Sequence, residues 1–404
     1  FGGQTPLKLA ERLQKAGVPI IGTSVDAIDL AEDREHFSEL VKRLGLRQAE
    51  YATASSLDQA LAAARRIGFP LMIRPSFVLG GRAMRVLFSE DDLRNYLAQG
   101  VEVSNERPVL LDRYLHNAIE LDLDLVSDGQ DFVVAGVMEH IERAGIHSGD
   151  SSCCLPPQTL GPNLIEELKI QAKLMAKELG VVGLMNVQYA VDKQGRIFVL
   201  EVNPRASRTV PFVSKSVGIS WAKVAARVMA GKSLKELEIM DAPSRPYTAV
   251  KACVFPFKRF EGVDTILGPE MKSTGEVMGI HSDFAGSFAK SQFAASIELP
   301  IKGTVFLSVP DDEKEELAPL ARRLVYLGFK LVATRGTAAY LTQRGFDVES
   351  VNKVREGSPH IVDLLGEGRI QLLINTPEGS APLLDSRSIR LVANELGIPT
   401  FTTI

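Results

Sequence analysis

Two β-rich runs near the middle of the chain, residues 183–190 and 196–203, constrain the fold more than any other feature. Between them, residues 192–195 form a short polar turn ending in Gly, which predicts that the runs pair as an antiparallel hairpin. Successive side chains of a strand point to opposite faces of a sheet. Alternation therefore predicts one apolar face on the second strand, made of Phe198, Leu200 and Val202.

The opposite face of this hairpin gathers side-chain oxygens. By the same alternation, Gln188 of the first strand lies with Glu201 and Asn203 of the second. Oxygen ligands suit Mg²⁺ or Mn²⁺, which proteins hold with one or two carboxylates together with substrate phosphates. Arg205 and Arg208 follow directly, and their charge suits a phosphate site. The alternative is an ordinary hairpin whose polar face is solvated.

A Gly-Gly loop joins two other β-rich runs, 70–75 and 84–88. Gly80 and Gly81 would let backbone amides approach a phosphate, and Arg74 lies just before the loop. It is no P-loop, because no Gly-Lys-Ser/Thr follows, and no dinucleotide fingerprint, because a strand comes next instead of a helix. A simple turn is the alternative.

Three further strand-like runs are expected at 109–115, 119–126 and 132–139. In the second, Glu120, Asp122 and Asp124 alternate with leucines. This acidic face suits ribose hydroxyls or a cation, or else it is solvated. The polar loop after the third run carries His147, and a lone loop histidine is more often a surface residue than a catalyst.

From about residue 299, short buried strands alternate with helices, which predicts a compact parallel α/β unit with ligands at the strand C-terminal ends. Its strands are expected at 304–309, 330–333, 370–375 and 399–402. Thr334 and Thr337 lie where one strand ends and a helix begins, so hydroxyls and free helix amides could hold a phosphate. Lys353 and Asn375 could complete this pocket, and no residue there resembles a nucleophile.

Composition narrows the class of protein. A length of 404 residues predicts two to four domains, and the formal charge of −4 carries no nucleic-acid signature. No apolar run approaches the ~18 residues of a membrane span. Three cysteines form neither a disulfide framework nor a metal spacing, which is typical of a cytoplasmic protein. The start at Phe1 without a methionine indicates a fragment.

Seven motifs together resemble a known family. They are residues 2–6 (GGQTP), 74–84 (RPSFVLGGRAM), 138–142 (MEHIE), 147–150 (HSGD), 201–205 (EVNPR), 210–215 (VPFVSK) and 273–277 (STGEV). In this order they are similar to ATP-grasp enzymes, and specifically to the carboxy-terminal half of carbamoyl phosphate synthetase large subunits. The resemblance implies an α/β and α+β protein: an ATP-grasp fold followed by a small parallel, methylglyoxal-synthase-like domain. It divides the chain into the tail of a pre-ATP-grasp domain (1–30), the ATP-grasp unit (31–298) and a regulatory domain (299–404).

The resemblance also implies an activity. This half would use ATP with Mg²⁺ or Mn²⁺ to phosphorylate carbamate, giving carbamoyl phosphate for pyrimidine and arginine synthesis. Its partners would be the amino-terminal half of the large subunit, a glutaminase small subunit and a nucleotide monophosphate effector, in an oligomer. Neither nucleic acid nor membrane is expected as a partner.

By motif position, the resemblance also assigns roles to single residues. The predicted ATP-binding residues are Arg34, Arg74, Gly80, Gly81, Arg113, Leu115, Glu120, Gly145, Ile146, His147, Ser148, Gln188 and Glu201. The predicted metal ligands are Gln188, Glu201 and Asn203, and Arg205 and Arg208 would meet the acyl phosphate. Effector contacts are expected at Lys314, Thr334, Thr337, Lys353 and Asn375.

Three positions depart from the family pattern. Arg113 stands where relatives often carry another residue, so only its backbone role carries over. Pro377 replaces a common hydroxyl in the effector pocket, which predicts weaker phosphate contacts. Glu142 and Asp150 match part of the ornithine site of some bacterial relatives, but Ala252 replaces an acidic residue there, which predicts weak or absent ornithine activation.

Two other readings are compatible with these motifs. A different ATP-grasp ligase, such as a biotin carboxylase or a peptide-type ligase, would share the hairpin metal site but not the 273–277 segment joined to an effector domain. A non-catalytic regulatory or assembly fragment would keep the fold and do no chemistry without its partner half.

Overall fold

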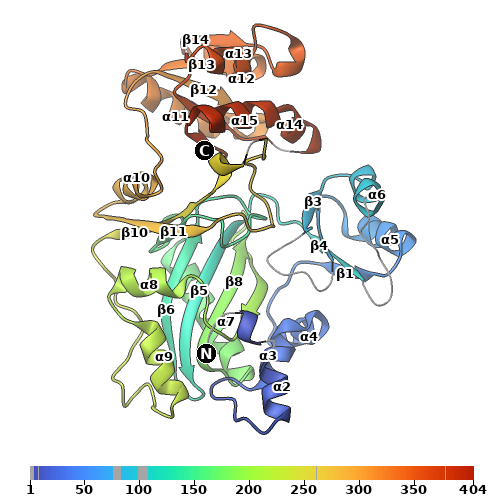
Figure 1. Ribbon diagram of the computed structural model, residues 1–404, viewed down its shortest axis with the longest axis vertical. Helices are drawn as coiled ribbons and strands as arrows, with labels where there is room; N and C mark the ends of the chain where they lie inside the picture. The colour runs from blue at the N-terminus through green and yellow to red at the C-terminus, as the bar shows by residue number, and fades with distance from the viewer. Residues whose placement is uncertain (1–3, 8, 76–82, 99–107, 261, 378) are drawn as a thin grey trace.

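The computed structural model describes residues 4–7, 9–75, 83–98, 108–260, 262–377 and 379–404, and these contain three β-sheets. The largest sheet lies at the centre, and a smaller sheet lies beside it. The C-terminal unit lies above the largest sheet in the view of Figure 1. At the N-terminus are two short helices, α1 (Gln4–Leu7) and α2 (Ala10–Lys15). No helix among the described residues is both long and apolar enough to cross a membrane.

The central sheet is antiparallel, with strand order β11-β10-β7-β6-β5-β8-β9. Its strands are β5 (Ile119–Asp128), β6 (Phe132–His140), β7 (Cys153–Leu155), β8 (Val182–Val191), β9 (Ile197–Asn203), β10 (Thr248–Val254) and β11 (Gly275–His281). The predicted hairpin is confirmed as β8 and β9, which pair Gln188 with Glu201. The short strand β7 was not expected.

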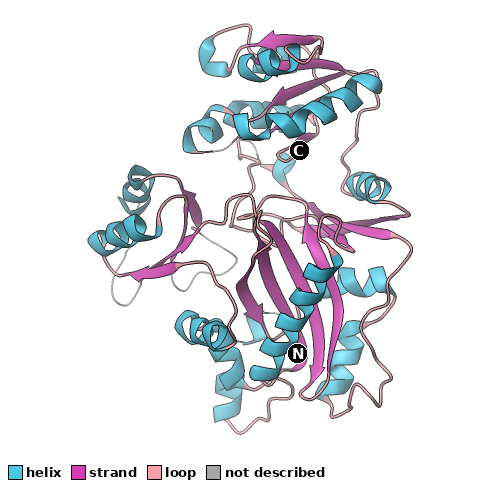
Figure 2. Ribbon diagram, turned by 180° about the vertical axis from the view of Figure 1, so that it is seen from behind, coloured by secondary structure: helices cyan, strands magenta, loops and turns pink. Residues whose placement is uncertain are grey.

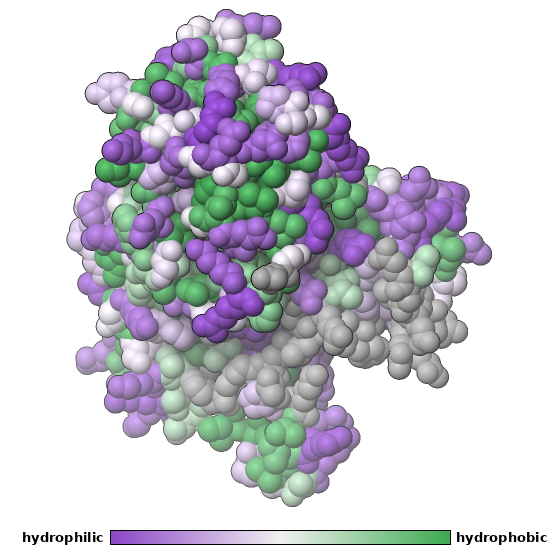
Figure 3. Space-filling view, turned by 45° about the horizontal axis from the view of Figure 1, so that its top comes forward, coloured by the Kyte–Doolittle hydropathy of each residue, from purple (hydrophilic) through white to green (hydrophobic). Residues whose placement is uncertain are grey.

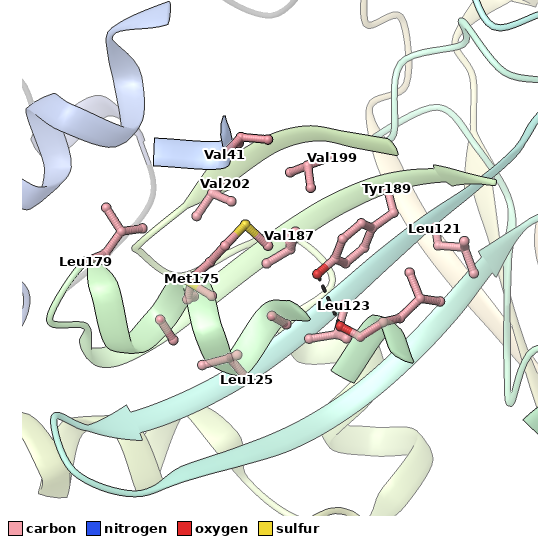
Figure 4. Packing of buried hydrophobic residues seen from close by; sticks show 14 of the residues in the cluster. Val41, Leu121, Leu123, Leu125, Met175, Leu179, Val187, Tyr189, Val199 and Val202 are labelled. Carbon is pink, nitrogen blue, oxygen red and sulfur yellow. Dashed lines mark hydrogen bonds between the residues drawn. The ribbon is translucent and has the colours of Figure 1, made fainter. Parts of the chain in front are cut away.

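Helices cover both faces of this sheet (Figures 1 and 2). On one face lie α3 (Val25–Glu32), α4 (Arg34–Arg43) and α7 (Pro162–Glu178); on the other lie α8 (Val210–Val217) and α9 (Trp221–Met229). Figure 4 shows the first interface, where Met175 packs among valines and leucines and the Tyr189 hydroxyl donates to the Leu168 carbonyl at 3.2 Å. Trp221 fills the second interface.

A bulge in β9 overturns one predicted face. Tyr189 pairs with Val199 and Gln188 with Glu201, so Leu200 is an extra residue without a partner across the hairpin. Such a bulge reverses the alternation beyond it. Val199 and Val202 therefore both enter the core, while Leu200 points to the opposite side, and the prediction of one shared apolar face was wrong.

The smaller antiparallel sheet has the order β1-β4-β2-β3. It comprises β1 (Tyr51–Ala54), β2 (Leu71–Pro75), β3 (Arg85–Leu87) and β4 (Val109–Arg113), packed against α5 (Leu57–Ile67) and α6 (Glu90–Ala98). β2 and β3 pair as the β-rich runs predicted. The Gly80 and Gly81 loop between them lies outside the described residues.

The C-terminal sheet is wholly parallel, as predicted, in the order β14-β13-β12-β15-β16. Its strands are β12 (Thr304–Ser308), β13 (Lys330–Thr334), β14 (Val348–Val351), β15 (Leu372–Asn375) and β16 (Thr400–Phe401). Its helices are α11 (Lys314–Tyr326), α12 (Arg335–Thr342), α13 (Ile361–Gly366), α14 (Ser380–Asp385) and α15 (Arg387–Leu396), and helix α10 (Phe284–Ala294) lies between the two units. Figure 3 brings this unit forward; polar residues cover most of the visible face, and apolar residues gather in smaller groups.

Candidate functional site

A cleft of about 720 Å³ opens where the hairpin of β8 and β9 meets the smaller sheet. Every described residue of the predicted ATP, metal and acyl-phosphate sets lines it: Arg34, Arg74, Arg113, Leu115, Glu120, Gly145, Ile146, His147, Ser148, Gln188, Glu201, Asn203, Arg205 and Arg208. These residues come from six separate stretches of chain. The fold therefore brings together what the motifs only implied.

Hydrogen bonds hold the hairpin oxygens in two groups, one around Asn203 and one at Gln188. Asn203 Nδ2 donates to Glu201 Oε1 at 2.8 Å, and Arg205 Nη2 donates to Asn203 Oδ1 at 2.8 Å. Gln188 Nε2 donates to Ser148 Oγ at 3.0 Å, which turns the amide so that its oxygen remains an acceptor. One carboxylate and two amide oxygens on neighbouring strands fit a hard divalent ion, provided that the Asn203 amide turns its oxygen toward Glu201.

Cationic side chains lie beside these oxygens. Asp112 holds both Arg34, through Nη2, and Arg74, whose Nε lies 3.3 Å from Oδ2. Arg34 Nη1 also donates to the Leu200 carbonyl at 3.4 Å, so the bulge in β9 supplies an acceptor for this guanidinium. Burial lowers the pKa of Arg34 from its ordinary value, and the carboxylate of Asp112 opposes that effect. Two cations sharing one carboxylate leave a net positive wall, which suits phosphate.

A loop of residues 144–149 forms the opposite rim. The Gly145 amide donates to Glu120 Oε1 at 2.9 Å, and the Tyr114 hydroxyl donates to the Ala144 carbonyl at 2.5 Å. A Cβ at Gly145 would lie 2.6 Å from the Tyr114 ring, and its φ of +90° also favours glycine. Only a residue without a side chain therefore fits under this tyrosine.

His147 is held in a partly buried position on that rim. Its backbone amide donates to the Gly268 carbonyl at 2.8 Å, and its Nδ1 accepts from the Gly149 amide at 3.0 Å. Burial, together with the nearby Arg208 guanidinium, lowers the pKa of His147 from its ordinary value. A neutral imidazole with Nδ1 as acceptor presents Nε2–H as a donor. His147 therefore lines the cleft in a partly buried position, and its role there stays a prediction.

The acidic face of β5 is not solvated beyond Glu120. Asp122 and Asp124 are buried at 1% exposure, and Asn186 Nδ2 donates to both at 3.0 Å. His140 Nε2 lies 2.7 Å from Asp122 Oδ2. Asp122, His140 and Cys153 come within 4.8 Å of one another, but the buried ammonium of Lys251 beside them opposes a cation there. Of these three carboxylates, Glu120 is therefore the candidate for binding ribose hydroxyls.

Other residues of the cleft were not predicted from the sequence. Lys251, 1% exposed, lies 3.5 Å from Glu276 Oε1, and both line the cleft. A lysine inside the apolar run of β10 was the available signal, because a buried ammonium needs a partner. Ala144, Ala190 and Leu200 form an apolar wall with the predicted Leu115. That wall suits the flat face of a base.

The C-terminal unit collects the predicted effector residues at one sheet edge. Ser308, Thr334 and Asn375 end the three neighbouring parallel strands β12, β13 and β15. Thr334 Oγ1 donates to Thr337 Oγ1 at 3.4 Å, and Lys314 Nζ lies 3.5 Å from a Cβ built at Gly336, so it faces the start of α12. Lys353 follows β14 at the same edge but is exposed. Four of the five residues thus converge, and Lys353 stands at their margin.

The two carboxylates that match part of an ornithine site in some relatives, Glu142 and Asp150, already accept backbone amides. Asp150 accepts from the amides of Lys272 and Ser273 at 2.7 and 2.9 Å, and Glu142 accepts from Ser152 at 2.5 Å. Ala252 is buried at 2% exposure and adds no charge.

Comparison with known proteins settles the family. Residues 33–237 match the family model described as carbamoyl-phosphate synthase L chain, ATP binding domain, and residues 316–402 match an MGS-like domain. The chain belongs to the carbamoyl-phosphate synthase large-chain family. It is 57% identical to the carbamoyl phosphate synthase large chain of Pseudomonas aeruginosa and 54% identical to that of Myxococcus xanthus, over its whole length in both cases. It spans only 38% and 37% of those two relatives.

Solved structures support the ATP-grasp fold. Biotin carboxylase from Campylobacter jejuni, crystallised with βγ-ATP, matches with a TM-score of 0.54 at 19% identity, over 66% of this chain and 60% of that one. An ADP complex of N5-carboxyaminoimidazole ribonucleotide synthetase matches with a TM-score of 0.57 at 16% identity, over 71% and 76%. At such identities the likeness concerns fold alone. The family match goes further, because it joins this fold to an MGS-like domain and so disfavours the reading as another ATP-grasp ligase.

Proposed function

We propose that the chain carries the carbamate-phosphorylating site of a carbamoyl phosphate synthetase, transferring the γ-phosphoryl group of ATP to carbamate. The observation that carries this proposal is the convergence of Gln188, Glu201 and Asn203 with Arg205 in one cleft of a family ATP-binding domain. No protein nucleophile is required, because the carbamate oxygen attacks the phosphorus itself. Catalysis then depends on positioning and on neutralising charge.

The nucleotide would lie across the cleft. Leu115, Ala190 and Leu200 would pack on the base, and Glu120 would accept from the ribose. Arg34 and Arg74 would contact phosphate oxygens, exchanging part of their bond with Asp112 for the nucleotide. Gly80 and Gly81 are proposed on motif position alone.

The reacting end would lie over the hairpin. Gln188, Glu201 and Asn203 would hold a magnesium or manganese ion, which would supply positive charge to neutralise the transferring phosphoryl group. Arg205 and Arg208 would face the carbamate and the acyl phosphate, and the neutral His147 would donate from Nε2 to a phosphate oxygen. The 144–149 loop would exclude water, since carbamate hydrolyses readily.

We further propose that the C-terminal unit binds a nucleotide monophosphate at Lys314, Thr334, Thr337 and Asn375, with Lys353 at the margin. An amino-terminal half, a glutaminase subunit, an oligomeric assembly and a cytoplasmic location are proposed from the family. Ornithine activation is expected to be weak, because both remaining carboxylates already accept backbone amides.

The reverse reaction tests the main proposal. The chain should form ATP from carbamoyl phosphate and ADP when Mg²⁺ is present, followed by coupled fluorescence. Glu201→Ala should lower that rate by at least about a hundredfold, because the hairpin loses its only charged ligand. The control Glu166→Ala, on the exposed side of α7, should leave the rate unchanged. Undiminished synthesis in Glu201→Ala would refute the metal role; no synthesis by the wild type would favour a non-catalytic fragment.

A further inference from the structure

One ion pair crosses directly from the C-terminal unit to the rim of the nucleotide cleft. Arg143 Nη2 donates to Glu313 Oε1, although the two residues are 170 positions apart in sequence. Only 25% of the Arg143 side chain and 12% of the Glu313 side chain are exposed. The other carboxylate oxygen of Glu313 accepts from Thr376 Oγ1 at 2.6 Å. Both oxygens of this carboxylate are therefore engaged.

Each end of this chain of contacts leads to a site. Arg143 directly precedes Ala144, whose carbonyl accepts from Tyr114, and Gly145, whose amide is bound by Glu120. Glu313 directly precedes Lys314, and Thr376 directly follows Asn375, so each is the chain neighbour of a residue of the proposed phosphate pocket. The guanidinium of Arg143 thus ties the residue just before the 144–149 loop to a carboxylate of the other unit.

The energetics favour a defined geometry. A partly buried ion pair in which one partner is removed leaves a charge that water cannot fully solvate. The hydrogen bond from Thr376 fixes the second oxygen of Glu313, so the carboxylate cannot rotate without losing a bond. A displacement of Glu313 would therefore move Arg143, and with it the backbone that lines the cleft.

We propose that Glu313, carried by the C-terminal unit, is a positioning residue of the nucleotide site that acts through Arg143 to hold the 144–149 loop. The inference rests on the proposed function, since it assumes that this cleft binds the nucleotide. Thr376, next to Asn375 of the phosphate pocket, donates to the same carboxylate. A change in the pocket that moves Thr376 would therefore change nucleotide affinity through Glu313 and Arg143.

Binding of MgADP to the whole chain, measured by calorimetry, tests the proposal. Glu313→Gln and Arg143→Gln should each weaken binding by about tenfold, and the double variant should be no weaker than either single one. Reversing the pair, as Arg143→Glu with Glu313→Arg, should restore affinity to within about threefold. Amide exchange in residues 144–149 should rise in Glu313→Gln. Glu349→Gln, which breaks an exposed ion pair in the same unit, should change neither measurement.

The outcomes separate the two proposals. If the wild type binds no MgADP, the proposed function fails and this inference with it. If the wild type binds but Glu313→Gln binds equally well, or if the two single effects add, the positioning role alone is overturned. Should Glu313→Gln not fold, Thr376→Val, which removes only the second hydrogen bond, should still weaken binding by about threefold; unchanged affinity in that variant would contradict the proposal.

Discussion

Asp124 is a buried carboxylate beside the cleft. Thr209, Ser207 and Asn186 donate to it at 2.6, 2.8 and 3.0 Å, yet burial raises its pKa to about 6. A raised pKa in the folded state stabilises the fold fully below the unfolded-state pKa, and this contribution is lost as the pH rises through about 6.

Asp124→Asn should remove that pH dependence. Between about pH 4 and about pH 7, the wild type should lose about 2 kcal/mol of unfolding free energy relative to the variant. Urea unfolding at several pH values measures the difference. Asp29→Asn, at an exposed position of α3, is the control and should run parallel to the wild type. A wild-type profile parallel to that of Asp124→Asn would contradict the assigned titration.

At the residue scale, motif position predicted which side chains meet in the cleft but not how they are held. Nothing in the sequence marks Asp112 as the shared partner of Arg34 and Arg74, because that contact joins helix α4 to the smaller sheet. The position of Lys251 inside an apolar strand was a signal in the sequence, but its partner Glu276 depends on the register of β10 against β11.

At the scale of elements, hairpin pairing was predictable and the bulge was not. Glycine-ended turns and alternating residues locate β8 and β9, but the extra residue Leu200 depends on how β9 closes against β8. The parallel C-terminal sheet was predicted because most of its strands are short, apolar and separated by helices. Strand β14 was not predicted, because two of its four residues are polar.

The packing of α10 on β11 depends on one glycine. A Cβ at Gly279 would lie 2.2 Å from the Ser287 carbonyl oxygen and 2.6 Å from the Ser291 amide nitrogen, both backbone atoms. Gly279→Ala should therefore push the helix away and lower the free energy of unfolding by about 3 kcal/mol, as measured by thermal unfolding. Gly275→Ala, on the same strand with nothing within 4 Å, should change stability by under about 1 kcal/mol. Equal melting temperatures for the two variants would mean that α10 does not pack closely against β11 at Gly279.

At the scale of the whole molecule, the contacts that join the two units have no local sequence pattern. The joint is the segment from η1 (Phe257–Arg259) to β11, which touches both units. Gly268 accepts from His147 at the cleft, and Asp264 accepts from Arg390 of α15 through two bonds of 2.7 and 2.6 Å. These contacts link residues more than a hundred positions apart, so no local pattern predicts them.

The Asp264–Arg390 pair should make the two units unfold together. The side chain of Arg390 is 3% exposed; burial opposes ionisation of Asp264, but the two bonds from Arg390 hold the pKa of Asp264 below its ordinary value. Asp264→Asn leaves the buried guanidinium without a counter-charge, which costs about 3–5 kcal/mol. Calorimetry should then resolve a separate, earlier transition for the C-terminal unit. Glu349→Gln removes an exposed pair and should keep the wild-type profile, because such pairs contribute under about 1 kcal/mol. A single transition at the wild-type temperature in Asp264→Asn would place the coupling between the units elsewhere.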